Sequence, residues 1–145
     1  MAQNQEELQQ KFVLYQLLNQ RLEEIKNQLN LVQQRLVELE TTNQALADVG
    51  GIKKDTEILI PLGSGLYAYG KASNSEKMLV DIGAGVMVKK EIGDAKKKIE
   101  GSKKEVEAAS ENMQNEALAI VNKMNELGVE LQKAIGEQQE GAGGS

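Results

Sequence analysis

The sequence predicts a mainly helical α+β protein, in which a long antiparallel coiled-coil hairpin carries two β-hairpins between its helices. Three observations support this class. Residues 4–48 contain neither Gly nor Pro, apolar residues recur every seven positions on both sides of the chain's middle, and most helix-breaking residues lie between Gly50 and Gly93. Because only 3% of the 145 residues are aromatic, a compact globular core is disfavoured. We therefore expect one elongated subunit over residues 1–145.

The first helix is expected over residues 4–49. Asn4 and Glu7 have the spacing of a capping pair, and Gly50 followed by Gly51 supplies a stop. Numbering by sevens gives two rows of mainly apolar residues, three positions apart, which are the a and d positions of a coiled coil. The a row is Leu8, Tyr15, Leu22, Leu29, Leu36 and Asn43, and the d row is Lys11, Leu18, Ile25, Val32, Leu39 and Leu46.

The middle segment, residues 52–90, contains an internal repeat with an offset of 20. The run 58–68, ILIPLGSGLYA, is similar to 78–88, MLVDIGAGVMV, and each copy is typical of a β-hairpin with a Gly-x-Gly turn. Ile58, Ile60 and Leu62 alternate onto one face, but Leu59 and Leu79 make the opposite faces apolar too. A two-stranded hairpin is marginal alone, so we expect other chains to cover these faces. The expected assembly residues are Ile58, Ile60, Leu62, Leu66, Met78, Val80, Ile82, Val86 and Val88.

The second helix is expected over residues 91–135, and it most simply returns antiparallel to the first. One row of its seam is Ile92, Ile99, Val106, Met113, Ile120, Leu127 and Ala134. The companion row is Ala95, Ser102 and Ala109, and then, after a change of phase, Ala117, Met124 and Leu131. This change predicts a four-residue stutter near Met113, where the supercoil should unwind. The tail, residues 136–145, has four Gly in ten residues, so we expect it to be flexible.

The composition disfavours most catalytic chemistry. With neither Cys nor His, the chain lacks thiol nucleophiles, imidazole bases and the usual zinc ligands. The net charge of −5 disfavours nucleic acid as a partner. Residues 63–68 fit G-x-G-x-x-A, but a strand rather than a phosphate-binding helix is expected to follow. Since the chain has no long apolar run and no signal peptide, we expect no membrane partner and a cytoplasmic location. We also expect no cofactor, no metal and no catalytic residue.

Apolar residues outside the seam gather at the end of the coiled coil that is far from the hairpins. Phe12, Val13, Leu14 and Leu17 lie off the seam of the first helix, and Val129 and Ile135 lie off the seam of the second. Such residues either contact another helix or chain, or form an exposed patch that binds apolar ligands or peptides. The candidate client-binding residues are Leu8, Phe12, Val13, Leu14, Tyr15, Leu17, Leu18, Leu127, Val129, Leu131 and Ile135.

From about residue 5 to 135 the sequence resembles the alpha-class subunits of prefoldin. The resemblance is carried by the two heptad helices and by the doubled hairpin EILIPLGSGLYAYGKASNSEKMLVDIGAGVMVKK, since the alpha class has two hairpins where the beta class has one. It implies an archaeal-type hexamer of two alpha and four beta subunits, whose hairpins form a double β-barrel. It also implies coiled-coil tips that hold unfolded proteins without ATP and deliver them to a group II chaperonin.

We therefore expect a molecular chaperone subunit that is not an enzyme and that works in a hetero-oligomer. The alternative is a coiled-coil scaffold or tether, which would assemble through the same hairpins without binding clients. Exposed apolar residues at the tip favour the chaperone, because a spacer would gain only a tendency to aggregate from them.

Overall fold

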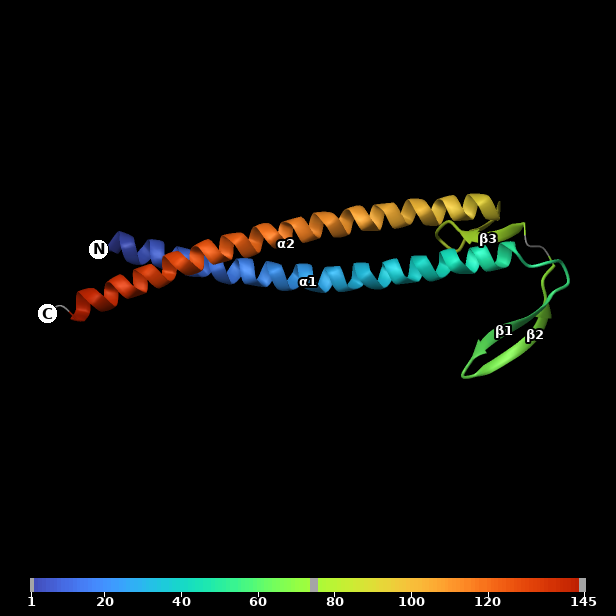
Figure 1. The fold of residues 1–145 in the computed structure, drawn as a ribbon, viewed down its shortest axis with the longest axis horizontal. Coiled ribbons are helices and arrows are strands. Elements are labelled where there is room, and N and C mark those ends of the chain that lie inside the picture. The colour runs from blue at the N-terminus through green and yellow to red at the C-terminus, as the bar shows by residue number, and fades with distance from the viewer. Residues whose placement is uncertain (1, 74–75, 144–145) are drawn as a thin grey trace. The chain divides into compact units, whose positions relative to one another are not determined.

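The computed structural model describes residues 2–73 and 76–143, with side chains from Asn4 to Glu137 within those ranges. Along the chain, one long helix precedes the four strands and a second follows them (Figure 1). In chain order the elements are α1 (Ala2–Gly50), β1 (Glu57–Gly63), β2 (Leu66–Lys71), β3 (Lys77–Asp81), β4 (Met87–Glu91) and α2 (Ile92–Gly143). The chain divides into two compact units, which we call the terminal unit (Met1–Gln33 with Ala108–Ser145) and the central unit (Gln34–Glu107).

Both expected helices and both expected hairpins are present, but α2 continues past its expected end at residue 135. Residues 136–143 continue α2 instead of lacking structure, and residues 144–145 lie outside the described part of the chain. Each Gly in a helix costs only about 1 kcal/mol relative to Ala. The segment between Gly136 and Gly141 contains only Glu and Gln, which are good helix formers, and no Pro interrupts it. The helix therefore has no strong signal to stop.

In the terminal unit, the seam residues of α1 and α2 form one apolar core. Ile25 is fully buried and packs with Ile120 and Met124. Lys11 pairs with Glu130 at 3.1 Å, and Arg21, further along α1, pairs with Glu116, which lies earlier in α2. The two helices of this unit therefore run antiparallel. Partly buried residues surround the core: Tyr15, Leu18, Leu22, Leu29, Met113 and Ala117.

The predicted stutter in α2 is confirmed. Met113 and Ala117 both pack against the core and are successive residues of the seam. They are four positions apart, whereas the regular repeat would place the next seam residue three positions after Met113. An unbroken heptad repeat would place Glu116 in the seam, but Glu116 is exposed and ion-paired. The change of phase at the stutter therefore keeps the charged side chain of Glu116 out of the core.

In the central unit, the seam pairs large residues of α1 with small residues of α2. Leu39 and Leu46 are buried on α1, and Ala95 is buried on α2. Lys103 and Glu40 bridge the two helices at 3.0 Å. Ser102 continues the row of Ala95 and is partly buried. The seam of α2 thus alternates small residues with the larger side chains of Ile99 and Val106.

Asn43 is the one polar residue among the a positions of the central unit's part of α1, and it is half-buried. A buried Asn at an a position costs stability. We expect Asn43→Leu to raise the melting temperature by about 2–4 °C, which corresponds to a gain of about 1 kcal/mol. Thermal unfolding followed by circular dichroism measures this shift. An unchanged melting temperature would mean that water already solvates Asn43.

The two hairpins share one register, as expected for an internal repeat. β1 pairs with β2 and β3 pairs with β4, both antiparallel, in two separate sheets. Glu57 faces Lys71 in the first hairpin, and twenty residues later Lys77 faces Glu91 in the second. The Gly-x-Gly turns have positive φ throughout, including 53° at Ser64 and 52° at Ala84. Positive φ at two successive residues is what a two-residue type I′ turn requires.

The alternation predicted for β1 holds only as far as Ile60. The register shifts between Pro61 and Gly63, so Leu62 lies in a bulge and does not simply continue the face of Ile58 and Ile60. Pro61 lacks a backbone N–H and cannot donate in the ladder, which is why Pro is often found next to bulges.

The second hairpin packs against the helices of its own unit. The Lys98 ammonium donates a hydrogen bond to the Asp81 carbonyl oxygen at 3.3 Å. A cavity of about 320 Å³ is bounded by β3 residues 78–81 and by residues of both helices, among them Leu46 and Ala95. The Ile92 N–H donates to the Glu76 carbonyl at 2.8 Å, which fixes the start of α2 next to the start of β3.

Candidate functional site

Exposed apolar side chains lie where the sequence predicted them, in the part of the terminal unit formed by residues 4–18 and 127–137, which we call the tip. Phe12 is 53% exposed and Leu17 is 56% exposed. Val13, Leu14, Val129 and Ile135 are exposed as well. Because none of these residues occupies the seam, the contact between α1 and α2 cannot cover them. The tip therefore presents apolar surface to solvent on several sides.

The remaining predicted client-binding residues belong to the seam. Leu8, Tyr15, Leu18 and Leu131 are half-buried and contribute only an edge to the surface. Leu127 is 3% exposed, so it cannot contact a ligand on the surface. Its role is to hold the two helices together. The predicted set thus divides into an exposed group that can bind and a seam group that supports it.

Three shallow cavities surround the tip. One, of about 210 Å³, is formed by Leu8, Gln9, Phe12, Leu131 and Ile135. A second, of about 380 Å³, lies on the outer face of α1 and is formed by Glu6, Gln9, Gln10, Val13, Leu14 and Leu17. The third, of about 390 Å³, is formed by Asn4, Glu7, Leu8, Lys11, Glu130, Ala134 and Glu137. The third is lined mainly by polar and charged side chains. The apolar side chains of the first two suit weak, non-directional contacts better than tight binding of one small molecule.

Two exposed apolar residues of α2 were missed by the sequence analysis. Leu118 is 62% exposed and Val121 is 37% exposed. Both lie off the seam by the heptad spacing, five and eight residues after Met113, but outside the tip, where the candidate residues of α2 were sought. The apolar surface of the terminal unit therefore extends beyond the tip.

A forked ion pair fixes the alignment of the helices next to the tip. Arg21 donates from Nε to Glu116 Oε1 at 2.8 Å and from Nη2 to Glu116 Oε2 at 3.2 Å. These hydrogen bonds lower the pKa of the Glu116 carboxyl and raise the pKa of the Arg21 guanidinium. A hydrogen bond from Lys103 to Glu40 likewise raises the pKa of Lys103 in the central unit.

The lowered pKa of Glu116 predicts an acid-sensitive contribution to stability. Its carboxylate is stabilised in the folded state, so the contribution is present above the unfolded pKa of about 4.3 and is lost as the pH falls through the lower folded value. We expect Glu116→Gln to reduce the difference in melting temperature between pH 6 and pH 3 relative to the parent. Glu111→Gln, at an exposed position of the same helix, should leave that difference unchanged. Equal pH profiles for both variants would contradict this assignment.

The hairpins present a second apolar surface. Leu62 and Leu66 are exposed beside the first turn, and Tyr69 is 79% exposed on β2. Of the predicted assembly residues, Ile60, Leu62, Leu66, Ile82 and Val86 are exposed, and Ile58, Met78, Val80 and Val88 are half-buried. Met78 and Val80 border the cavity next to the helices, so part of their burial arises within the chain. Sequence analysis did not single out the exposed residues Tyr67, Tyr69 and Met87.

The structure offers no support for the chemistry that the sequence analysis weighed and set aside. Residues 63–68 comprise the end of β1, the turn and the start of β2, so no helix follows the G-x-G-x-x-A motif. Among the described residues, no group of three acidic, His or Cys side chains could hold a metal ion. Over the same residues, neither helix contains an apolar stretch long enough to cross a membrane.

Comparison with known proteins identifies the family. The sequence model of the family described as "Prefoldin subunit" matches residues 18–137. "Prefoldin subunit alpha" of Thermofilum pendens is 28% identical over 127 residues, which cover 88% of this chain and 96% of the relative. "Prefoldin subunit alpha" of Archaeoglobus fulgidus is 36% identical over 92 residues, which cover 63% of this chain and 67% of the relative.

The fold comparison agrees with the sequence comparison. A chain of the cryo-EM structure of filamentous PFD from Methanocaldococcus jannaschii aligns with a TM-score of 0.72 and 17% identity, covering 81% of this chain and 97% of that chain. At that identity the likeness concerns the fold, which is two long helices around small antiparallel hairpins. The fold likeness, the doubled hairpin and the family match agree. The chain therefore belongs to the prefoldin family of non-enzymatic chaperone subunits, as an archaeal-type alpha subunit.

Proposed function

We propose that the tip of this chaperone subunit captures unfolded proteins without nucleotide and delivers them to a group II chaperonin in the cytoplasm. The observation that carries the proposal is the set of exposed apolar side chains at the tip, including Phe12, Val13 and Leu17. Unfolded chains expose apolar side chains that folded proteins bury, so an apolar surface selects them. Contacts of this kind need no particular sequence in the client.

The assembly that we propose is a hexamer of two alpha and four beta subunits, in which the hairpins form a double β-barrel. The exposed apolar residues of both hairpins support it, because surfaces of this kind on paired strands are normally covered by another chain. Several arms in one particle would bind one client at several points. Weak contacts then combine through effective concentration into firm binding.

An aggregation assay tests the proposal. The purified chain, alone and with a beta-class subunit, is mixed with a chemically unfolded client in buffer without ATP. We expect the mixture to suppress light scattering at substoichiometric to equimolar particle concentration. The alternative function, a coiled-coil scaffold or tether, requires the same oligomer but no suppression. An oligomer of the expected mass that leaves scattering unchanged would favour the scaffold.

A further inference from the structure

Two opposite sides of the terminal unit differ in charge. We define the ionic side by the bridges from Lys11 to Glu130 and from Arg21 to Glu116. On α2, Glu116, Lys123, Glu130 and Glu137 follow at intervals of seven, so all four share this side. Residues two positions before or after them point about 200° away around the helix and lie on the opposite side, which we call the neutral side.

From the ion pair of Glu23 and Lys26 to the tip, none of the described residues on the neutral side is charged. On α2 it consists of Leu118, Val121, Asn125, Gly128, Gln132 and Ile135. On α1 it consists of Gln9, Phe12, Gln16 and Asn19. The cavity that joins Gln9, Phe12 and Ile135 shows that the two helices contribute to one surface. Every member except Gly128 is exposed.

This composition matches an extended polypeptide. The carboxamides of Gln and Asn both donate and accept hydrogen bonds, as backbone amides do. A folded partner has already paired most of its backbone N–H and C=O groups, whereas an extended segment still offers them. Apolar side chains of that segment can lie against Phe12 and Ile135 at one end of the surface and against Leu118 and Val121 at the other, with carboxamides such as Asn125 and Gln132 between them. A permanent helix partner would instead require a continuous apolar stripe.

We propose that the neutral side is a track that binds an extended segment of unfolded polypeptide, from Phe12 and Ile135 at the tip to Leu118. The proposal rests on the proposed chaperone function and specifies both the ligand conformation and the side of the arm. Recognition through carboxamides and apolar groups is independent of the client's charge. Binding along the track should therefore depend little on salt concentration, in contrast to binding by charged side chains.

Site-specific crosslinking tests the track directly. The chain has no Cys, so a single introduced Cys can carry a photo-crosslinker. Asn125 lies on the neutral side, and the exposed Asn122, three residues earlier, lies on the outer face of α2. In the assembled protein with an unfolded client, we expect at least fivefold more client adduct from Asn125→Cys than from Asn122→Cys. Equal adduct yields would overturn the track. Adducts between two copies of the chain without client would also overturn it, because the side would then be an interface.

Two isosteric double variants test how much the neutral side contributes to protection of an unfolded client. Gln16→Glu with Gln132→Glu places two charges on the neutral side, and Gln20→Glu with Gln28→Glu places the same two charges elsewhere on exposed positions of α1. We expect the first pair to raise the concentration needed for half-maximal protection about fivefold and the second pair to change it less than twofold. Equal effects would refute the track. If protection needs Phe12, Val13 and Leu17 but tolerates the first pair, the track fails while the proposed function stands.

Discussion

Replacing Phe12, Val13 and Leu17 together with Ser is expected to remove most of the aggregation suppression while the oligomer keeps its mass. All three side chains are exposed and lie outside the seam, so their loss leaves the packing of Ile25 with Ile120 unchanged. Each arm loses roughly 1–3 kcal/mol of apolar contact for each side chain that the client would bury. In the proposed hexamer several arms would hold one client, so these losses would multiply across the particle.

The measurement is light scattering of an unfolded client at fixed particle concentration, with sedimentation as a check on assembly. Leu31 and Val37 provide a matched control, since both are exposed apolar residues of α1 outside the tip. Changing these two to Ser should preserve protection. If the tip variant assembles normally and still protects the client as well as the parent, capture at the tip is wrong and the scaffold function is favoured.

Replacing Leu62 and Leu66 together with Ser is expected to break the oligomer while both helices remain formed. These residues lie on either side of the first turn and are among the most exposed apolar residues of the hairpins. Covering each by another chain stabilises the contact by roughly 1.5–3 kcal/mol, so losing both should weaken association on the order of a hundredfold or more. Val80 is a poorer probe, because it borders the cavity next to the helices of its own chain.

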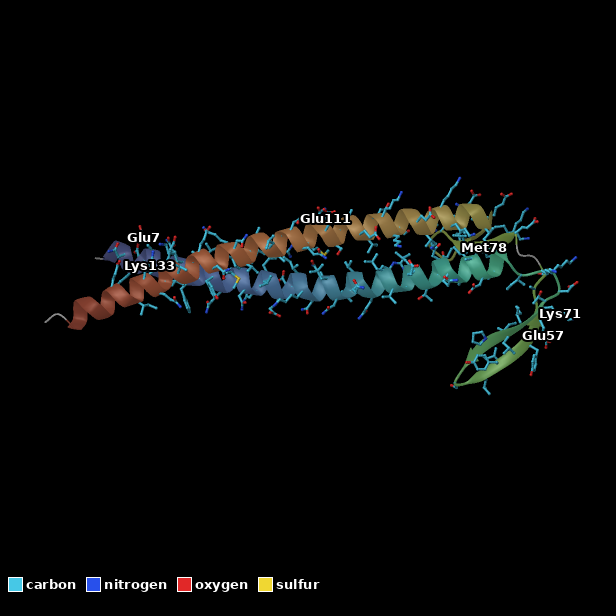
Figure 2. All side chains as sticks on the ribbon, viewed as in Figure 1. Glu7, Glu57, Lys71, Met78, Glu111 and Lys133 are labelled. Atoms are coloured by element: carbon cyan, nitrogen blue, oxygen red, sulfur yellow. The ribbon has the colours of Figure 1, made fainter. Side chains whose placement is uncertain are left out.

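Analytical ultracentrifugation with the beta-class partner reports the mass, and circular dichroism reports the helices. Glu57 and Lys71, which face each other across the open end of the same hairpin (Figure 2), supply a control. Changing both to Gln leaves the net charge and the apolar surface unchanged, so the oligomer should persist. An unaltered mass for the Leu62 and Leu66 variant would show that this hairpin surface does not mediate assembly.

Most of the fold could be predicted because the heptad repeat connects sequence to structure directly. The rows that contain Ile25, Leu39 and Ile120 follow from spacing alone, as does the stutter after Met113. The two hairpins follow from the repeat and from Gly at positive φ. The helix of residues 136–143 was not predicted, because Gly weighs against a helix on composition even where its local cost is small.

The site was predicted in part, and the misses have physical causes. Exposure of Phe12 and Leu17 follows from their positions off the seam, and the same spacing places Leu118 and Val121 off the seam, although these two lie outside the tip. The bulge at Leu62 and the packing of β3 against the helices depend on tertiary structure. No periodicity in the sequence encodes which of two similar hairpins contacts its own helices.

The pairing of large residues of α1 with small residues of α2 affects which helices pair when several copies of the chain lie close together. Large side chains of α1 such as Leu39 and Leu46 lie in the same seam as the small side chains of α2 such as Ala95 and Ser102. Two copies of α2 facing each other would leave voids at every small residue, and two copies of α1 would crowd their large ones. Neighbouring arms in an assembly are therefore discouraged from pairing like helices, α1 with α1 or α2 with α2, without any disulfide to enforce the choice.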